Sequence, residues 1–321
     1  MLSRPDFLQK QLVVIQAEKT KNLTLKFRNE NLVIYSEGKI KSKTSLHKIF
    51  AIFIVGDFTV TSPAIRHCVE HAISLFLLKR NLEVYAEIEP LARGNFLLRH
   101  RQYHLSPDQE LETAIELVRQ KTANQLHLLK KYLPKTTHRA LRTKLTQDLN
   151  KASSFDSLLG IEGALAKAYF AALFKEYEWR GRRPRSKPDP NNLLLDIGYT
   201  YLFNFVDALL RLYGFDTYKG VYHRLFFQRK SLACDLMEPF RTLIDHALLK
   251  AWHRGQIKPG DFRQKQGQYY LPYAAQKPYT ELFLNSLLQH KATLYDYVKA
   301  YYRHVMNPTD NPFPVFKHRP R

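Results

Sequence analysis

Residues 154–179 read SFDSLLGIEGALAKAYFAALFKEYEW, and this stretch decides the fold of the larger part of the chain. Ser154 is a good helix N-cap, and apolar residues follow it at helical spacing, which predicts a long helix. Glu162 lies on the apolar side of this helix, between Gly160 and Gly163. Because glycine inside a helix costs about 1 kcal/mol relative to alanine, the pair predicts a close approach by another backbone or by a ligand.

The carboxylate of Glu162 needs a partner of its own. Charged side chains are almost never fully buried unless they are paired or bind a metal. Glu162 therefore predicts one of two things, a structural ion pair with a buried arginine or a ligand of a metal ion. This residue alone does not distinguish them.

Further helical patterns flank this stretch and predict a mostly helical domain over residues 95–306. The predicted helices cover residues 107–132, 136–150, 154–179, 192–213, 231–253 and 279–304. Residues 90–94 hold proline and glycine and are predicted to be a linker. Residues 307–321 are basic and rich in proline, which predicts a loose tail.

The first 89 residues read mostly as strands. Leu23, Leu25 and Phe27 alternate with polar residues, as in a half-buried strand, and the apolar run of residues 49–55 predicts a buried one. One helix is expected to begin at Ser62 and to continue past Phe76 to a stop at Asn81. The sequence therefore predicts an α+β fold, with a small β-rich domain at residues 1–89 before the larger all-α domain.

Composition restricts the possible partners. The 321 residues include 50 Lys and Arg against 29 Asp and Glu, a formal net charge of +21. Such an excess indicates a polyanion such as DNA, and the alternative is solubility through self-repulsion. The two cysteines offer no metal-binding spacing or disulfide framework, which fits a reducing cytoplasm. The chain shows no signal peptide, and its longest apolar run is too short to span a membrane.

A second group of candidate ligands follows two glycines, Gly214 and Gly220, which predict a turn that delivers His223 to a fixed place. Asp235 and Glu238 are three residues apart and project from one helix face. Carboxylates favour Mg²⁺ or Mn²⁺, and an imidazole among them leans toward Mn²⁺. In the alternative interpretation, Asp235 only stabilises a helix N-terminus and Glu238 pairs with an arginine one turn later, at residue 241.

A basic segment joins the Glu162 helix to the next helix. Its cationic residues are Arg180, Arg182, Arg183, Arg185 and Lys187. Arginine matches phosphate geometry, so these residues are predicted to bind the DNA backbone. The alternative is a solvated loop.

One histidine pair imitates a zinc motif. His67 and His71 are four residues apart on the predicted N-terminal helix, but Cys68 stands where the zincin pattern requires glutamate. The sequence shows no third ligand nearby. An exposed helix face is therefore the favoured interpretation of this pair.

Five stretches, in this order, resemble the CRISPR-associated adaptation integrases of the Cas1 family. They are residues 159–163 (LGIEG), 188–192 (PDPNN), 198–199 (GY), 220–223 (GVYH) and 231–241 (SLACDLMEPFR). The resemblance implies an N-terminal domain that mediates homodimerisation and a C-terminal catalytic domain. It also implies a metal site made by Glu162, His223 and Glu238, with Asp235 beside it as a further catalytic residue.

The same resemblance implies an activity and a partner. The protein would insert short DNA fragments into the repeats of a CRISPR array by metal-dependent transesterification, and it would also act as a metal-dependent DNA endonuclease. The small protein Cas2 would bridge two dimers. The competing hypothesis is a non-catalytic, basic DNA-binding scaffold whose acidic cluster only stabilises the helical domain.

Overall fold

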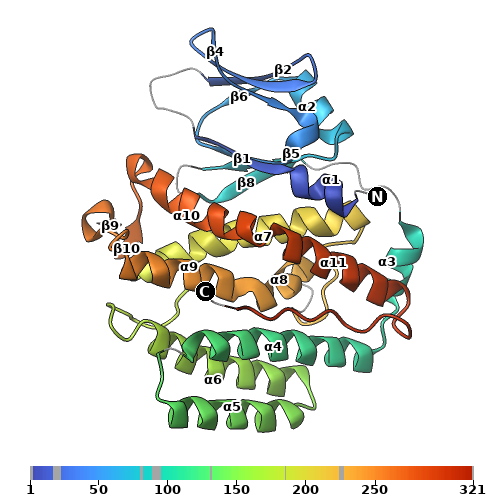
Figure 1. The fold of residues 1–321 in the computed structure, drawn as a ribbon, viewed down its shortest axis with the longest axis vertical. Coiled ribbons are helices and arrows are strands. Elements are labelled where there is room, and N and C mark those ends of the chain that lie inside the picture. The colour runs from blue at the N-terminus through green and yellow to red at the C-terminus, as the bar shows by residue number, and fades with distance from the viewer. Residues whose placement is uncertain are drawn as a thin grey trace.

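The computed structural model describes residues 3–16, 23–79, 82–88, 95–130, 132–184, 186–223 and 228–319. A narrow β layer stands at one end of the molecule, a second sheet lies beneath it, and helices form the rest (Figure 1). The predicted α+β class is confirmed. Two sequence assignments, the linker at residues 90–94 and Arg185, lie outside the described residues.

In its described residues, the N-terminal region contains two four-stranded sheets, two α-helices and one 3₁₀ turn. Its elements are α1 (Arg4–Gln9), β1 (Gln11–Gln16), β2 (Leu23–Arg28), β3 (Asn31–Ser36), β4 (Lys39–Ser45), the 3₁₀ turn η1 (Leu46–Lys48), β5 (Ile49–Val55), β6 (Thr59–Val60), α2 (Ser62–Glu70), β7 (Ser74–Leu78) and β8 (Val84–Ile88). The outer sheet has the order β4-β3-β2-β6, and the inner sheet has the order β1-β5-β7-β8. Strands β1, β5 and β7 are parallel, while β8 is antiparallel to β7.

The predicted helix over residues 62–81 is wrong in its second half. Helix α2 ends at Glu70, and Ser74–Leu78 forms strand β7 beside β5. Four apolar residues follow Ser74 in the run SLFLL, and four of the five residues are buried. A strand inside a parallel sheet buries both faces, whereas a helix at this place would bury one. The polar edge strand β4 was not predicted, because it carries no apolar alternation.

The helical region contains most of the chain. Its elements are α3 (Phe96–Tyr103), α4 (Pro107–Leu129), α5 (Lys135–Asn150), α6 (Phe155–Leu173), α7 (Pro190–Tyr213), α8 (Ser231–Met237), η2 (Glu238–Phe240), α9 (Arg241–His253), η3 (Pro259–Asp261), β9 (Arg263–Lys265), β10 (Gln268–Tyr270), η4 (Tyr273–Ala275), α10 (Gln276–Gln289) and α11 (Lys291–Met306). The helix predicted at 231–253 is interrupted by η2 at Pro239, which lacks an N–H for the helix ladder. The helix predicted at 279–304 is two helices that meet at His290.

Helix α7 lies at the centre of the molecule. It is long and apolar enough to pass a test for a membrane span, but 83% of its most apolar window is buried inside the fold, as in a core helix. At Gly198 a Cβ atom would stand 2.4 Å from Ile244 and 2.9 Å from Phe283. Glycine at this position therefore lets α9 and α10 pack directly against α7.

The inner sheet and the helical region share one hydrophobic core. Phe50 of β5 meets Phe205 of α7 with ring centroids 5.4 Å apart, and Phe53 meets Tyr201 at the same distance. The sheet is therefore anchored to the helices across these rings, whatever the connection along the chain.

The C-terminal segment is not loose over residues 307–319, so that prediction is wrong. Gln120 donates to the Pro314 carbonyl and accepts from the Phe316 N–H. Asn124 does the same with the Phe316 carbonyl and the His318 N–H. Two side chains of α4 thereby satisfy the backbone of a segment whose prolines prevent it from forming a helix.

Candidate active site

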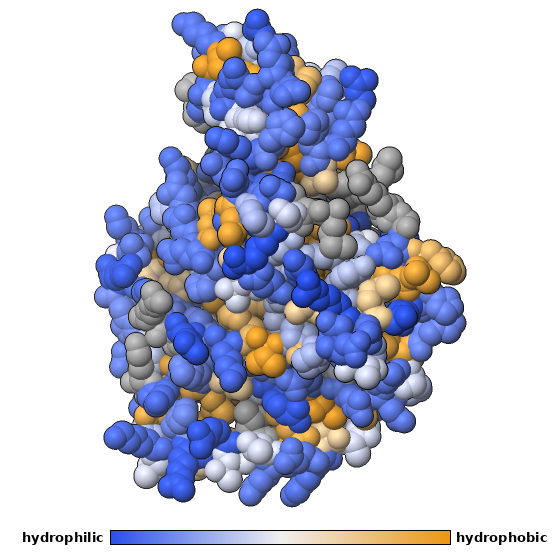
Figure 2. All heavy atoms as spheres, turned by 45° about the vertical axis from the view of Figure 1, so that its right-hand side comes forward, coloured by the Kyte–Doolittle hydropathy of each residue, from blue (hydrophilic) through white to orange (hydrophobic). Residues whose placement is uncertain are grey.

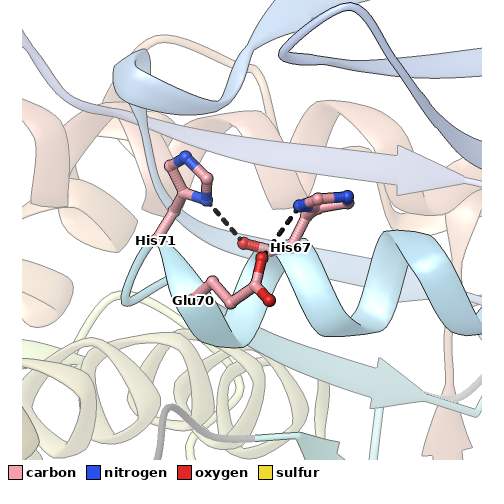
Figure 3. Close-up of side chains that lie close together, drawn as sticks. All are labelled: His67, Glu70 and His71. Carbon is pink, nitrogen blue, oxygen red and sulfur yellow. Dashed lines mark hydrogen bonds and ion pairs between the residues drawn. The ribbon is translucent and has the colours of Figure 1, made fainter.

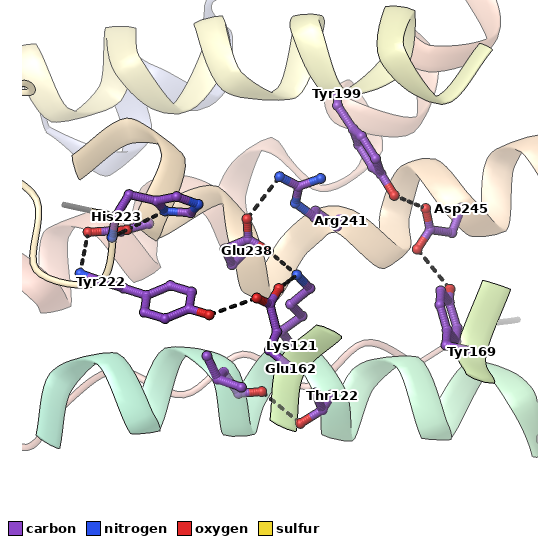
Figure 4. Close-up of polar contacts among 12 residues, drawn as sticks. Lys121, Thr122, Glu162, Tyr169, Tyr199, Tyr222, His223, Glu238, Arg241 and Asp245 are labelled. Atoms are coloured by element: carbon purple, nitrogen blue, oxygen red, sulfur yellow. Dashed lines mark hydrogen bonds and ion pairs between the residues drawn. The ribbon is translucent and has the colours of Figure 1, made fainter. Parts of the chain in front are cut away.

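Polar residues from four segments meet in the helical region (Figure 4). Glu162 comes from α6, Lys121 from α4, Glu238 from η2, and His223 from the loop before α8. Among the described residues, the ammonium of Lys121 lies between the two glutamates and forms ion pairs with both. The two glutamates singled out from the sequence therefore lie at one place, and their role there stays a prediction.

Glu162 has two partners. One carboxylate oxygen accepts from Lys121, and the other accepts from the Tyr222 hydroxyl at 2.7 Å. Burial, followed by the nearby Glu162 carboxylate, raises the pKa of Tyr222, so this hydroxyl stays a proton donor. Glu162 does form an ion pair, but the predicted partner is wrong: the cation that contacts it is Lys121 and not an arginine.

Glu238 is buried, with 2% of its side chain exposed, and is charged. Burial alone would raise its pKa, but Arg241 at 2.8 Å and Lys121 at 2.6 Å outweigh burial and lower the pKa to about 2. The alternative predicted from sequence, a pair with Arg241 one turn later, is therefore present. Glu238 Oε2 lies 2.6 Å from the Lys121 ammonium and Oε1 lies 2.8 Å from the Arg241 guanidinium, so each carboxylate oxygen faces a cation.

Asp235 supports the loop that carries His223. Its Oδ2 accepts the N–H groups of Val221 and Tyr222, and its Oδ1 accepts the N–H of His223 at 2.9 Å. The same Oδ1 lies 2.6 Å from His223 Nδ1. Because a carboxylate accepts, a neutral His223 ring carries its proton on Nδ1 and its lone pair on Nε2. A Cβ at Gly220 would stand 2.6 Å from Asp235 Oδ2, so only glycine lets the loop approach this closely.

A second network continues from the site along α9. The Arg241 guanidinium stacks over the Tyr199 ring at 4.5 Å. Asp245 accepts from the Tyr199 hydroxyl at 2.5 Å and from the Tyr169 hydroxyl at 2.7 Å. Burial raises the pKa of Asp245 to about 6, although both hydroxyls and Arg241 oppose this shift. No local pattern in the sequence marked these residues.

The helix face beside Glu162 is open. A Cβ added at Gly160 or at Gly163 would meet no described atom within 4 Å, and both glycines are exposed. The predicted close approach by another backbone is therefore wrong within the part of the chain that the structure describes. The other alternative, approach by a ligand, remains a prediction.

The basic segment between α6 and α7 is organised by the residues that begin α7. Asp189 caps that helix through the Asn192 N–H at 2.8 Å, and the Asn192 side chain binds the Gly181 carbonyl and the Arg183 N–H. Arg182 turns inward, where its guanidinium lies 2.6 Å from Asp196 and 3.0 Å from Asn192. The side chains of Arg180 and Arg183 are exposed, and that of Lys187 is half-buried.

A strongly basic pocket lies between α4 and α5 and was not predicted. It has a volume of about 550 Å³, and its ionisable lining residues are Arg119, His127, Lys130, His138, Arg139 and Arg142. No aspartate or glutamate lines it. The pocket gathers cations from two helices whose charges are spread along the sequence, so no single run of residues marked it.

The donor set of the site fits a divalent cation. Two glutamate carboxylates converge on one cation, the Lys121 ammonium, and a neutral His223 ring with its proton on Nδ1 offers the lone pair of Nε2 as a further ligand. The ligand atoms of Glu162, His223 and Glu238 do not all lie within 4.8 Å of one another. Among the described residues, only His67, Glu70 and His71 bring three ligand atoms within 4.8 Å of one another.

Comparison with known proteins identifies the family. The family model for CRISPR associated protein Cas1 matches residues 18–285. The CRISPR-associated endonuclease Cas1 1 of Thermodesulfovibrio yellowstonii is 29% identical over 314 residues, which cover 90% of this chain and 96% of that relative.

Two solved structures have the same fold. A casposase bound to integration product has a TM-score of 0.81 at 21% identity, and the match covers 97% of this chain and 94% of the casposase. A chain of a Cas6-RT-Cas1–Cas2 complex has a TM-score of 0.77 at 26% identity, over 97% of this chain and 36% of the other. With its helical region, its paired glutamates and this match over most of its length, the chain belongs to the CRISPR-associated protein Cas1 family.

Proposed function

We propose that this Cas1 protein is a metal-dependent DNA integrase and endonuclease that inserts short DNA fragments into a CRISPR array. One observation carries the proposal: Glu162 and Glu238, from different helices, converge on a single cation beside His223. Support also comes from the relatives, which include a named endonuclease and a casposase bound to integration product.

Glu162, His223 and Glu238 would hold Mg²⁺ or Mn²⁺, which activates an attacking hydroxyl and neutralises charge on the reacting phosphate. The other residues prepare this set. Tyr222 orients Glu162, while Arg241 keeps Glu238 ionised at neutral pH. Asp235 holds the His223 ring and fixes its proton on Nδ1, although its own oxygens are occupied by loop N–H groups.

Substrate would approach over the open face of α6. Gly160 and Gly163 leave space beside Glu162 for a nucleic-acid backbone. In-line attack at phosphorus depends mainly on positioning and charge neutralisation, which a cation and a basic surface can supply. The face of the molecule in Figure 2 is largely hydrophilic, with hydrophobic side chains scattered over it.

Two basic features would bind the DNA backbone. The first is the segment before α7, through Arg180, Arg183, Arg185 and Lys187. We expect Arg182 to contribute less to DNA binding, because its guanidinium already pairs with Asp196. The second is the pocket between α4 and α5, which is lined by cations from both helices. Contacts of this kind release counterions and make the affinity fall with salt.

We further propose a homodimer formed through the N-terminal region, and Cas2 as the partner that bridges two dimers. A Cas1–Cas2 assembly is named for one structural relative at 26% identity. The reaction would take place in the cytoplasm. Size measurements of the protein, alone and with its own Cas2, test the assembly independently of catalysis.

The deciding experiment is strand transfer of a short DNA duplex with a free 3′-hydroxyl into a supercoiled plasmid. It compares wild type with Glu162→Gln and Glu238→Gln, with and without Mn²⁺ and Cas2. Glu281→Gln, at an exposed position of α10, is the matched control. Joining that requires metal and is lost only in the two site variants supports the proposal. Tight, salt-sensitive DNA binding with no joining by wild type would favour the non-catalytic scaffold.

A further inference from the structure

A second group of metal-ligand side chains lies on α2, in the N-terminal region. His67 and Glu70 lie in the last turn of α2 and His71 caps its C-terminus, and one ligand atom of each lies within 4.8 Å of the others (Figure 3). From the sequence alone, an exposed helix face was the favoured interpretation, because no third ligand was visible nearby. The structure supplies that third ligand as Glu70, whose carboxylate folds back toward His67.

The His67 imidazole is held in place. Its ring stacks on Phe27 of β2 with centroids 3.5 Å apart, and 19% of its side chain is exposed. Its Nδ1 lies 3.0 Å from Glu70 Oε2. Zinc bonds of about 2.0–2.1 Å in a tetrahedron place neighbouring ligand atoms about 3.3 Å apart. The His67–Glu70 separation is already close to that edge length.

The His71 ring is also fixed. Its Nδ1 donates to the His67 carbonyl at 2.9 Å, so the neutral ring keeps its lone pair on Nε2. This is the hydrogen bond that commonly orients a metal-binding histidine. His47 of η1 adds a further imidazole, with its ring centroid 5.3 Å from that of His71. The cluster therefore offers two histidines and a carboxylate from α2, and a neighbouring histidine from η1.

We propose that His67, Glu70 and His71 form a second metal site, specific for a borderline transition ion such as Zn²⁺ and separate from the Glu162–Glu238 site. Two imidazoles and one carboxylate favour Zn²⁺, Ni²⁺ or Cu²⁺ over Mg²⁺ and Ca²⁺. Histidines at i and i+4 lie on one helix face, as chelation requires. An ion bound there, with His47 as the fourth ligand, would tie α2 to η1 and stiffen the outer β layer.

Zinc binding to tag-free protein tests this site. Equilibrium dialysis in excess Mg²⁺, which is intended to keep the carboxylate site filled, should give one Zn²⁺ per chain for wild type. The joint change His67→Asn and His71→Asn should weaken binding by about tenfold or more, because two of the ligands are lost. Glu70→Gln changes an exposed side chain and removes one ligand, so it should weaken zinc binding less. It tests the site even if the double variant does not fold.

The chain offers a matched control. His100 and His104 on α3 have the same i,i+4 spacing, and His104 Nδ1 donates to the His100 carbonyl in the same way. The three ligand atoms found together on α2 have no counterpart at this pair in the described residues. Replacing both by Asn should leave zinc binding unchanged. Equal binding by the α2 variants and wild type, or loss in the α3 control, would overturn the proposal, and neither result bears on the integrase activity.

Discussion

Replacing Lys121 by methionine is the sharpest perturbation of the candidate active site. The side chain is 8% exposed, and its ammonium contacts both Glu162 and Glu238. At an effective dielectric constant of about 20, one ion pair at 2.6 Å is worth about 6 kcal/mol before desolvation. Much of this attraction offsets the cost of removing the charges from water.

Removing one partner of a buried pair typically destabilises a protein by about 3–5 kcal/mol. Glu238 keeps Arg241, and Glu162 keeps Tyr222, so we expect the lower end, about 3 kcal/mol. This loss corresponds to a fall in Tm of about 4–5 °C for a chain of 321 residues, at about 2.1 cal/mol/K of unfolding entropy per residue. A divalent cation would then bind the carboxylates without competition from the ammonium. We therefore expect Mn²⁺ to raise the Tm of Lys121→Met more than that of wild type.

The assay is thermal unfolding followed by circular dichroism, in EDTA and in Mn²⁺. Lys130→Met, at the exposed end of the same helix, is the control and should behave as wild type in both buffers. The reasoning would be refuted if Lys121→Met melted at the wild-type temperature in EDTA. It would also be refuted if Mn²⁺ shifted both proteins equally, because the ammonium would then not occupy the position of the cation.

Three further predictions concern pH, loop support and DNA binding. The pKa of Asp245 is raised to about 6 in the folded protein, so folding favours its protonated form. Its contribution to the free energy of unfolding is therefore present below about pH 4 and lost by about pH 6, a change of about 3 kcal/mol that Asp245→Asn should remove from a stability–pH profile. Asp235→Ala, which leaves three loop N–H groups without an acceptor, should lower stability by about 2–4 kcal/mol and abolish strand transfer, and unchanged hydrogen exchange of the loop would contradict this. Arg139→Gln with Arg142→Gln should reduce the slope of log Kd against log salt by about 2 for duplex DNA, whereas the exposed Lys277→Gln should not change it.

The sequence by itself determined the α+β class and the position of several long helices. Capping residues and apolar periodicity are local signals, so they predicted α4, α5 and α7 to within three residues at either end. The resemblance selected Glu162 and Glu238, and the structure brings both to one cation. Local patterns were less reliable for short apolar runs, which can be buried either as a helix or as a strand. Ser74–Leu78 is such a run, and it forms strand β7.

Only the tertiary structure decided which residues meet. Lys121 is 41 positions before Glu162 along the chain and contacts it because α4 packs on α6. Gln120 and Asn124, which are also buried on α4, are polar residues at core positions, and they were a local sign that this helix face is not purely apolar. The same physics explains Arg182, which belongs to a basic run yet pairs with Asp196 inside the fold. The reason is that charge and periodicity are properties of a segment, whereas an ion pair depends on where packing places its two members.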